Sequence, residues 1–481
     1  MFLRRPSVAL GIAVLGTALL IPLETLRTQS ARPPLQSAAE AIVGGGGDDW
    51  SIMAWSLDRK TPLFAINAEQ IRVPASNNKV FTSIWALEVL GQDHRFPTDL
   101  LLPGDIPSDG VVRGNVYIRG SGDPAFGYPE FTEDAMDPLR VMARNLQARG
   151  VRVVEGGVVA DATHFDTLHV GPDWPLDTGG GAAYYAPGVS GLPFQRNVAW
   201  VEVVTGGPGP SVQLDPPVSE IPVVSTVRTG GGRAWAVRKA GEDTIRVRGA
   251  VSGRGPHRFP VGVNTPPQLA AGALRQALIE AGIQVRGGVV VGETPPGAKL
   301  IHRHYSMPLG QMIPKLNRDS DNFFAEHLWK AAVAESIGIG SYTRGGPASA
   351  RFFIRHAKVP PGQIWQADGS GLSSQNRASA LSLVSALAFA AGRPWSQTFH
   401  ESLAIGGDPG GTLRRMFNGT PADGKLHAKT GYIRQVRTLS GYVTTASGEQ
   451  VAFSFLYNGR NTSGARGVQQ QLGDLLASYS R

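Results

Sequence analysis

Ser76-Asn77-Asn78-Lys79 is a motif in which a nucleophile and its base can meet, and it occurs once in the chain. Positions i and i+3 share a face of a helix, so the lysine amine can lie beside the serine oxygen. Serine is a weak nucleophile until a base takes its proton. Lysine can be that base when burial or a nearby positive charge lowers its pKa. The spacing therefore predicts acyl-transfer chemistry, with Ser76 as nucleophile and Lys79 as base. The alternative is a helix cap at Ser76 beside a solvated Lys79.

Ser320-Asp321-Asn322 is a second motif, in a short loop between two helical patterns. The pattern Ser-x-Asn also occurs at Ser76 and Ser374, so the context has to select among these places. A hydroxyl in such a loop can point into a cleft. We expect Ser320 to relay a proton to a leaving amine and Asn322 to hold the substrate backbone. An N-cap at Ser320 is the alternative.

Lys429-Thr430-Gly431 is the third motif, and it also occurs once. It belongs to an alternating stretch, residues 425–433, that predicts a strand. Lys429 would offer positive charge to a substrate carboxylate, Thr430 a hydroxyl, and Gly431 a close approach of the backbone. A surface strand with a solvated lysine is the alternative. In this order, the three motifs are the signature of serine β-lactamases and penicillin-binding proteins.

The elements that must position these motifs fall into two groups. The outer parts of the chain predict a hairpin, helices and closing strands, at residues 50–56, 63–67, 74–91, 307–316, 322–336, 438–445, 450–456 and 467–478. In the middle, valine-rich runs alternate with glycine and proline turns. They predict strands at residues 114–118, 151–159, 199–204, 244–251 and 285–291, and a helix at 267–282. We expect one catalytic domain in two parts, 45–92 and 301–481, interrupted by strand-rich inserted domains over 93–300.

Residues 1–30 have the features of an export signal. Arg4 and Arg5 precede an apolar run over residues 8–23, and a short basic stretch before such a run is typical of secretory signals. The run is slightly short for a membrane span, which needs about 20 residues. We expect a cleaved signal and a location in the periplasm or cell envelope, with an uncleaved N-terminal anchor as the alternative.

Composition narrows the class of protein. At 481 residues, with 42% hydrophobic and 17% charged residues, the chain is expected to be globular and to form two or three domains. The absence of cysteine excludes disulfides, thiolate catalysis and cysteine zinc sites. The net charge of +8 fits a solvated basic surface, or else attraction to an anionic wall or membrane. No cluster of basic and aromatic residues suggests nucleic-acid binding.

The chain resembles the S13 family of D-Ala-D-Ala carboxypeptidases, also called low-molecular-mass class C penicillin-binding proteins. The similarity runs from about residue 49 to the C-terminus. Besides the three motifs, it is carried by residues 73–76, 120–124, 161–165, Trp174, 185–187, 320–326, 368–373, 406–407 and 411–413. The resemblance implies an α/β fold: a penicilloyl-serine transferase (β-lactamase-like) domain, with its sheet between helices, split by a strand-rich insertion of two nested domains.

The resemblance also implies an activity. A serine-type D-Ala-D-Ala carboxypeptidase would act on peptidoglycan stem peptides through an acyl-enzyme on Ser76, with no cofactor or metal, and β-lactams would inhibit it. The N–H groups of Ser76 and of a residue just after Gly431 would hold the oxyanion. Asp161 and Phe165 would help to hold the amino end of the stem-peptide side chain, and Asp166 competes for the carboxylate's role.

Several alternatives share these residues. A DD-endopeptidase that cleaves peptidoglycan cross-links would use the same site. A β-lactamase is less favoured, because the long stretch between Ser76 and Ser320 is not needed for a small substrate. An inactive wall-binding module is less favoured because all three motifs are intact. Tyr432 stands where the family often has threonine, which would reshape the substrate groove. The absence of a Gly-x-Ser-x-Gly elbow disfavours a Ser-His-Asp hydrolase.

Overall fold

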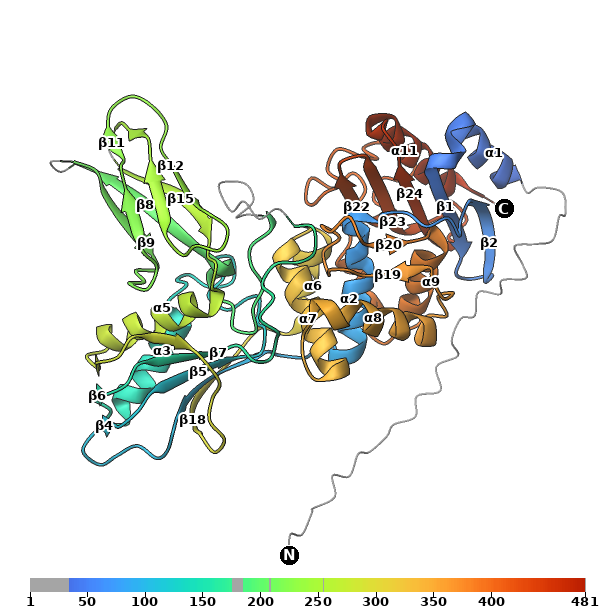
Figure 1. Ribbon diagram of the computed structural model, residues 1–481. Helices are drawn as coiled ribbons and strands as arrows, with labels where there is room; N and C mark the ends of the chain where they lie inside the picture. Colours follow the sequence, from blue (N-terminus) through green and yellow to red (C-terminus); the bar gives the residue numbers. More distant parts are fainter. Residues whose placement is uncertain (1–33, 175–184, 207–208, 254, 481) are drawn as a thin grey trace, which may run out of the picture.

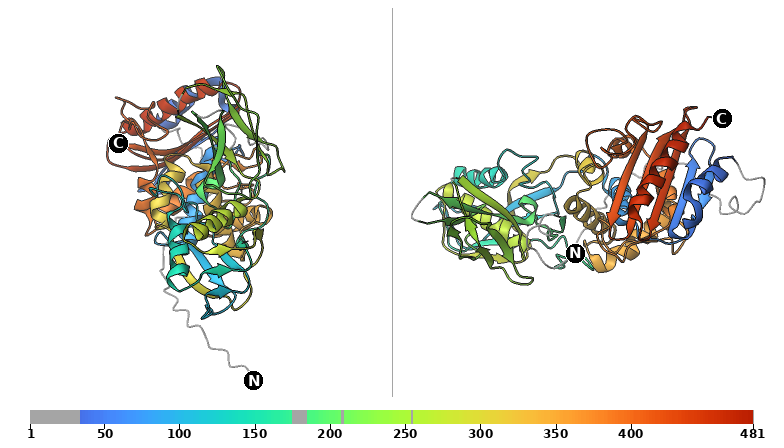
Figure 2. Two further views of the ribbon diagram at one scale, coloured as in Figure 1. Left: turned by 90° about the vertical axis from the view of Figure 1, so that its left-hand side faces the viewer. Right: turned by 90° about the horizontal axis from the view of Figure 1, so that it is seen from above.

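The computed structural model describes residues 34–174, 185–206, 209–253 and 255–480, so the expected export signal lies outside the described residues. Two bodies lie end to end (Figures 1 and 2). One contains both ends of the described chain, and the other is built from the middle of the sequence. No helix among the described residues combines the length and apolar character needed to cross a membrane.

The first body is organised around a six-stranded antiparallel sheet in the order β2-β1-β24-β23-β22-β21. The strands are β1 (Trp50–Ser56), β2 (Thr61–Ile66), β21 (Ala404–Ile405), β22 (Leu426–Ile433), β23 (Val436–Thr444) and β24 (Gln450–Asn458). The first two and the last three come from opposite ends of the chain. The sheet therefore joins strands that lie on either side of the whole middle part of the sequence.

Strand β1 shows that helices cover both faces of this sheet. All of its residues are buried, and successive side chains of a strand point to opposite faces. Ile52 and Ala54 belong to a core shared with α1 (Pro34–Val43) and α11 (Thr462–Ser478). Met53 and Trp55 belong to a second core, shared with helices of the other face (Figure 1).

Helix α2 is the centre of that second core. Its residues from Asn78 to Leu87 are all buried, and Gly91 ends it with a φ of 89°. The helices around it are α6 (Leu309–Asn317), α7 (Asn322–Ile337), α8 (Tyr342–His356), α9 (Ala380–Ala391) and α10 (Ser396–Glu401). A short hairpin, β19 (Ile364–Trp365) and β20 (Arg377–Ala378), completes the body. A helix so enclosed can hold a polar side chain away from water.

The second body holds two groups of sheets. One has the sheets β17-β7-β5-β3-β18 and β16-β6-β4 with helices α3 and α5; the other has β15-β8-β9, β10-β13-β12 and β11-β14. The elements of the first group are β3 (Pro97–Leu102), β4 (Val111–Val112), β5 (Val116–Gly120), α3 (Asp137–Ala148), β6 (Val153–Val154), β7 (Val158–Asp161), α5 (Pro266–Glu280), β16 (Gln284–Val285), β17 (Val289–Val291) and β18 (Lys299–Tyr305). The elements of the second group are β8 (Val198–Thr205), β9 (Ser211–Asp215), β10 (Val223–Ser225), β11 (Arg228–Thr229), β12 (Trp235–Arg238), β13 (Ile245–Arg248), β14 (Ala250–Val251) and β15 (Gly255–Gly262).

The predicted fold class, an α/β fold with a sheet between helices, is confirmed. Some elements differ. The run predicted as one strand over 151–159 is two strands, because Gly157 crosses so close to Gly288 that a Cβ would lie 1.8 Å from its carbonyl oxygen. Helices α1, α3, α8, α9 and α10 are not among the predicted helices. In α8 the glycines lower the helical propensity of the sequence. Gly345 is needed because the helix passes close to the Trp329 ring. The domain boundaries stay predictions.

Candidate active site

Ser76 lies in a tight turn at the start of α2. A short 3-10 helix, Ala75–Asn77, precedes the α-helix, and Ala75 has a φ of 46°. Ser76 is partly exposed, whereas Lys79, one helical turn further on, is wholly buried. The two residues of the first motif therefore stand on either side of the boundary with solvent, with the hydroxyl reachable and the amine enclosed.

The Lys79 amine has a defined set of partners. Its Nζ lies 3.2 Å from Ser76 Oγ and donates to Asn322 Oδ1 at 2.6 Å and to the Ser370 carbonyl at 2.7 Å. Neither carbonyl oxygen can donate a proton, so both must be met by N–H groups. A neutral amine has two N–H groups and one lone pair. When both N–H groups are used in this way, the lone pair is left facing Ser76.

Burial makes the neutral amine accessible near neutral pH. It lowers the pKa of Lys79 to about 8, against the opposing effect of the carboxyl groups of Glu326, Asp368 and Asp321. Burial also lowers the pKa of Lys429 well below its usual value, and the neighbouring Lys79 lowers it further. A general base works best when its pKa is close to the pH at which it operates. Lys79 therefore meets the electrostatic requirement for a base.

The second motif lies where α6 and α7 meet. Asp321, not Ser320, is the N-cap: its carboxylate accepts the N–H groups of Phe323 and Phe324. Ser320 has a φ of 63°, and its Oγ accepts a hydrogen bond of 2.8 Å from Lys429. Because the Ser320 Oγ acts as the acceptor in this contact, its hydroxyl hydrogen can be donated to another group. The alternative of an N-cap at Ser320 is thus wrong.

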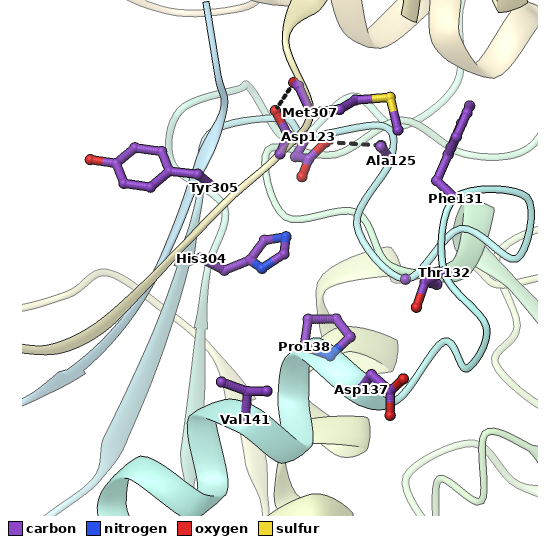
Figure 3. Close-up of a pocket in the computed structure, with 12 residues that line it drawn as sticks. Asp123, Ala125, Phe131, Thr132, Asp137, Pro138, Val141, His304, Tyr305 and Met307 are labelled. Atoms are coloured by element: carbon purple, nitrogen blue, oxygen red, sulfur yellow. Dashed lines mark hydrogen bonds between the residues drawn. The ribbon is translucent and has the colours of Figure 1, made fainter. Parts of the chain in front are cut away.

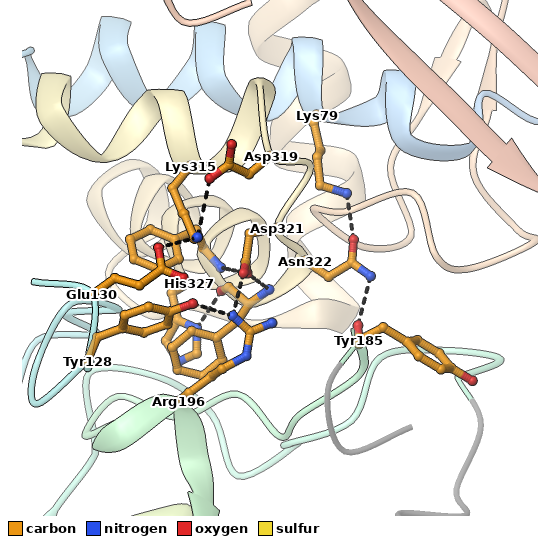
Figure 4. A network of polar contacts seen from close by, with 12 residues as sticks. Lys79, Tyr128, Glu130, Tyr185, Arg196, Lys315, Asp319, Asp321, Asn322 and His327 are labelled. Atoms are coloured by element: carbon orange, nitrogen blue, oxygen red, sulfur yellow. Dashed lines mark hydrogen bonds and ion pairs between the residues drawn. The ribbon is translucent and has the colours of Figure 1, made fainter. Parts of the chain in front are cut away.

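Asn322 joins the base to the surrounding chain. Its amide oxygen accepts from Lys79, and its amide nitrogen donates to the Tyr185 carbonyl at 2.7 Å (Figure 4). These two contacts fix which end of the amide faces the lysine. A side chain held in this way can orient Lys79 and, from the same position, contact a bound peptide.

The third motif forms part of strand β22, as predicted. The Lys429 amine donates to its neighbour Thr430 O at 2.7 Å as well as to Ser320. Gly431 passes so close to the nucleophile's turn that a Cβ would lie 3.0 Å from Ser76 N and 2.0 Å from Thr438 Oγ1. Any larger residue at 431 would push the strand from Ser76. Tyr432, the next residue, is 60% exposed.

Several residues that position the site were not identified from the sequence. Asn77 Nδ2 donates to the Lys429 carbonyl at 2.8 Å, which ties the first motif to the third. Glu326 accepts the N–H groups of Gly369 and Ser370, at 3.0 and 2.6 Å, and so holds the Ser370 carbonyl on Lys79. Burial, followed by the charge of Asp368, raises the pKa of Glu326 to about 8. In the sequence, the family resemblance over residues 320–326 and 368–373 was the signal that could have identified Glu326 and its partners.

Asp161 and Phe165 lie in a different environment. The Asp161 carboxylate accepts from Thr163 Oγ1 at 2.6 Å and from Thr294 N at 2.8 Å. Burial would raise its pKa, but these hydrogen bonds hold the pKa below its usual value. The Phe165 ring is 3% exposed and packs beside Lys330, whose amine binds Asp166 at 2.6 Å. The proposed contribution of Asp161 and Phe165 to substrate binding stays a prediction.

Arg196 connects the middle body to the second motif. It follows Gln195 in a left-handed turn before β8, and its guanidinium forms an ion pair with Asp321 and donates to Tyr128 OH at 2.7 Å (Figure 4). The guanidinium also lies 5.8 Å from the centre of the Phe323 ring. The side chains of Arg196 and Asp321 are only 11% and 8% exposed. The loop that carries Ser320 is thus held from both bodies.

Comparisons with known proteins show which family the chain belongs to. The model of the D-Ala-D-Ala carboxypeptidase 3 (S13) family matches residues 37–479. A D-alanyl-D-alanine carboxypeptidase of Actinomadura sp. (strain R39) is 32% identical over 439 residues, which cover 87% of this chain and 79% of that protein. The crystal structure of penicillin binding protein 4 from Haemophilus influenzae has the same fold, with a TM-score of 0.76 and 22% identity over 92% of this chain and 99% of that one. A second structure of that protein, with a bound β-lactam, has a TM-score of 0.72, with 22% identity over the same shares of the two chains.

The Arg196–Asp321 ion pair predicts a large loss of stability when one partner is removed. We expect Arg196→Met to lower the free energy of unfolding by about 3–5 kcal/mol, because a buried carboxylate loses its counter-ion. The matched control is Arg113→Met. The side chains of its ion pair with Asp109 are 62% and 46% exposed, so the free energy of unfolding should stay close to that of the unsubstituted protein. Urea denaturation followed by tryptophan fluorescence measures both, and equal losses would contradict a structural role for the buried pair.

Proposed function

The chain belongs to the S13 family of D-Ala-D-Ala carboxypeptidases, and we propose that Ser76 is the nucleophile with which it removes the terminal D-alanine of peptidoglycan stem peptides. The observation that carries this proposal is the set of contacts around Lys79. Two carbonyl acceptors take up the N–H groups of the neutral amine and leave its lone pair facing Ser76 Oγ, 3.2 Å away. A serine paired with such a base is equipped for acyl transfer.

Acylation begins when Lys79 accepts the Ser76 proton and Oγ attacks the carbonyl carbon between the two terminal D-alanines. The new C–O bond pushes an electron pair onto the carbonyl oxygen, where the N–H groups of Ser76 and of a residue just after Gly431 would hold it. Collapse of this intermediate breaks the C–N bond. The departing amine takes a proton from the Lys79 ammonium through the Ser320 hydroxyl. Water then attacks the ester and releases the shortened peptide.

Lys429, Thr430 and Asn322 are proposed to hold the substrate. A free C-terminal carboxylate near Lys429 would stabilise the charged form of an amine whose pKa burial otherwise keeps low. Thr430 is partly exposed beside it and can donate a hydroxyl. Asn322 is placed to contact the peptide backbone. Asp161 and Phe165 would support the surface that receives the amino end of the stem-peptide side chain, a part of the proposal that rests on family resemblance.

β-Lactams are proposed to react with the same serine. Their strained ring presents an amide carbonyl, and the ring nitrogen stays tethered to the acyl group after the C–N bond breaks. The tethered group cannot diffuse away and stands in the path of the water, so the acyl-enzyme persists. The relative from Haemophilus influenzae has been crystallised with a β-lactam, which supports this step.

An exported location is also proposed, because the polymer that carries the substrate lies outside the cytoplasmic membrane. Arg4 and Arg5 with the apolar run at residues 8–23 support a cleaved signal and release to the periplasm or cell envelope. N-terminal sequencing of the protein recovered from the envelope of its native cells tests this directly. We expect a mature N-terminus after residue 23; recovery of the protein only from the cytoplasm, with Met1 intact, would overturn the proposal.

Ser76→Ala tests the nucleophile. After brief exposure to benzylpenicillin, mass spectrometry of the unsubstituted protein should show a one-to-one adduct on the peptide that contains Ser76. Ser76→Ala should lose both the adduct and the release of D-alanine from a D-Ala-D-Ala peptide, because the hydroxyl that lies beside the Lys79 amine is removed. Ser374→Ala is the matched control, since it alters another Ser-x-Asn sequence, and it should keep the adduct. An adduct that survives in Ser76→Ala would place the nucleophile elsewhere.

The lowered pKa of Lys79 predicts the pH dependence of acylation. The neutral amine is the active form, so the rate must rise as the pH passes upward through a pKa of about 8. We expect the second-order rate constant for benzylpenicillin to increase by about tenfold between pH 7 and pH 9 and then to level off. Stopped-flow measurement gives the rate, and the reaction of Ser76→Ala supplies the background of alkaline hydrolysis. A rate that is constant or falls over this range would exclude Lys79 as the base.

A further inference from the structure

A cavity lies in the middle body, on its side toward the helices of the first body, and its lining includes no residue of the three motifs. Its volume is about 390 Å³. Three segments form it: the loop after β5, the start of α3 and the end of β18 with the residues that lead to α6 (Figure 3). Ligand pockets in proteins have volumes of about 300–1,000 Å³ and combine apolar walls with a few polar groups. The volume of the cavity falls in this range, so its lining residues can indicate which kind of ligand it would accept.

Asp123 is the polar group at the inner end of the cavity. It is 1% exposed. Its Oδ1 accepts the N–H of Ala125 at 2.9 Å, while its Oδ2 has no hydrogen-bond partner among the described residues. Figure 3 shows this second oxygen directed into the cavity, toward the side of His304. An unpaired buried carboxylate oxygen is costly, so a group that enters the cavity and pairs with it would be strongly favoured.

The rest of the lining sets the chemistry of that group. Phe131, Pro138, Val141 and Met307 present carbon surfaces. The lining contains two carboxylates, Asp123 inside the cavity and Asp137 on the first turn of α3, and no lysine or arginine. Its one imidazole is that of His304. Burial, followed by the charge of His302, lowers the pKa of His304, so its ring is neutral at physiological pH. The cavity therefore disfavours anions and suits an organic cation.

We propose that this cavity binds a primary ammonium group carried on a short alkyl chain, with the ammonium on Asp123 and the chain against the apolar walls. A water molecule would satisfy Asp123 less well, because an ordered buried water needs two to four polar partners and the walls are mainly carbon. The ring of Phe131 adds an aromatic face, which attracts an organic cation. A primary ammonium group on a short alkyl chain is found in free diamines and in the side chains of diamino acids within peptides.

Isothermal titration of the full chain with 1,5-diaminopentane and with Nα-acetyl-lysine amide tests the proposal. We expect saturable binding at one site for at least one probe and none for 1-pentanol, which has no charge. Tighter binding of the diamine would indicate a small free amine as the ligand. Tighter binding of the lysine derivative would indicate a peptide side chain. Absence of binding by both probes at 10 mM, pH 8.5, would overturn the proposal.

Two substitutions locate the binding in the cavity. Asp123→Asn keeps the shape and the acceptor for Ala125 but removes the charge, and should weaken binding at least tenfold. Val141→Trp fills the cavity from α3 and leaves Asp123 unchanged, so it should weaken binding even if Asp123→Asn is poorly folded. Asp109→Asn, an exposed carboxylate in the same body, is the matched control and should bind normally. Full affinity in both cavity variants would place the amine elsewhere.

The pH dependence gives an independent readout. Burial raises the pKa of Asp123 to about 7, whereas an alkyl ammonium stays charged up to a pH of about 10. The other titratable side chains of the lining are His304 and Tyr305 of β18 and Asp137 of α3. Affinity should therefore rise by about tenfold from pH 6 to pH 8.5, as Asp123 ionises. A pH-independent affinity would contradict a role for the Asp123 carboxylate.

Discussion

The burial of the Lys79 amine is the constraint on which the rest of the structure depends. An ammonium group removed from water loses much of its solvation, which lowers its pKa and makes the neutral form accessible. The same burial would leave its N–H groups without acceptors if Asn322 and the Ser370 carbonyl did not meet them. The site therefore needs α2 enclosed by helices, a strand that passes close to Ser76 at Gly431, and a loop that brings an inward-facing carbonyl to the lysine.

The middle body contributes to this arrangement by contact. Asp321 caps α7 and is at the same time held by Arg196, which lies at the base of the inserted sheets. Because Ser320 and Asn322 are its direct neighbours in the chain, an ion pair to Asp321 limits how far they can move. The middle body is thus in direct contact with the loop that carries the second motif. The loop after β5 contributes Tyr128 to the same contact.

Much of the fold could be predicted because its signals are local. The strand at 50–56, the helix after Ser76 and the strand of Lys429 follow from periodicity and turn residues, and the structure has them within a few positions. Where prediction failed, packing overrode local preference. Helix α8 contains Gly345 next to Trp329, a glycine required by close approach and not by a turn. The valine-rich runs of the middle body are cut where glycines cross one another, an arrangement that involves residues far apart in sequence.

For the candidate site, the sequence by itself determined the pairing of Ser76 with Lys79, because the geometry of one helical turn fixes that distance wherever the helix lies. It also determined the chemical types at the other two motifs. Only the tertiary structure decided that Lys429 would reach the Ser320 hydroxyl, and that Glu326 would hold the carbonyl facing Lys79. These contacts join segments that are distant along the chain. Their formation depends on how whole helices and sheets pack, and no local pattern encodes that packing.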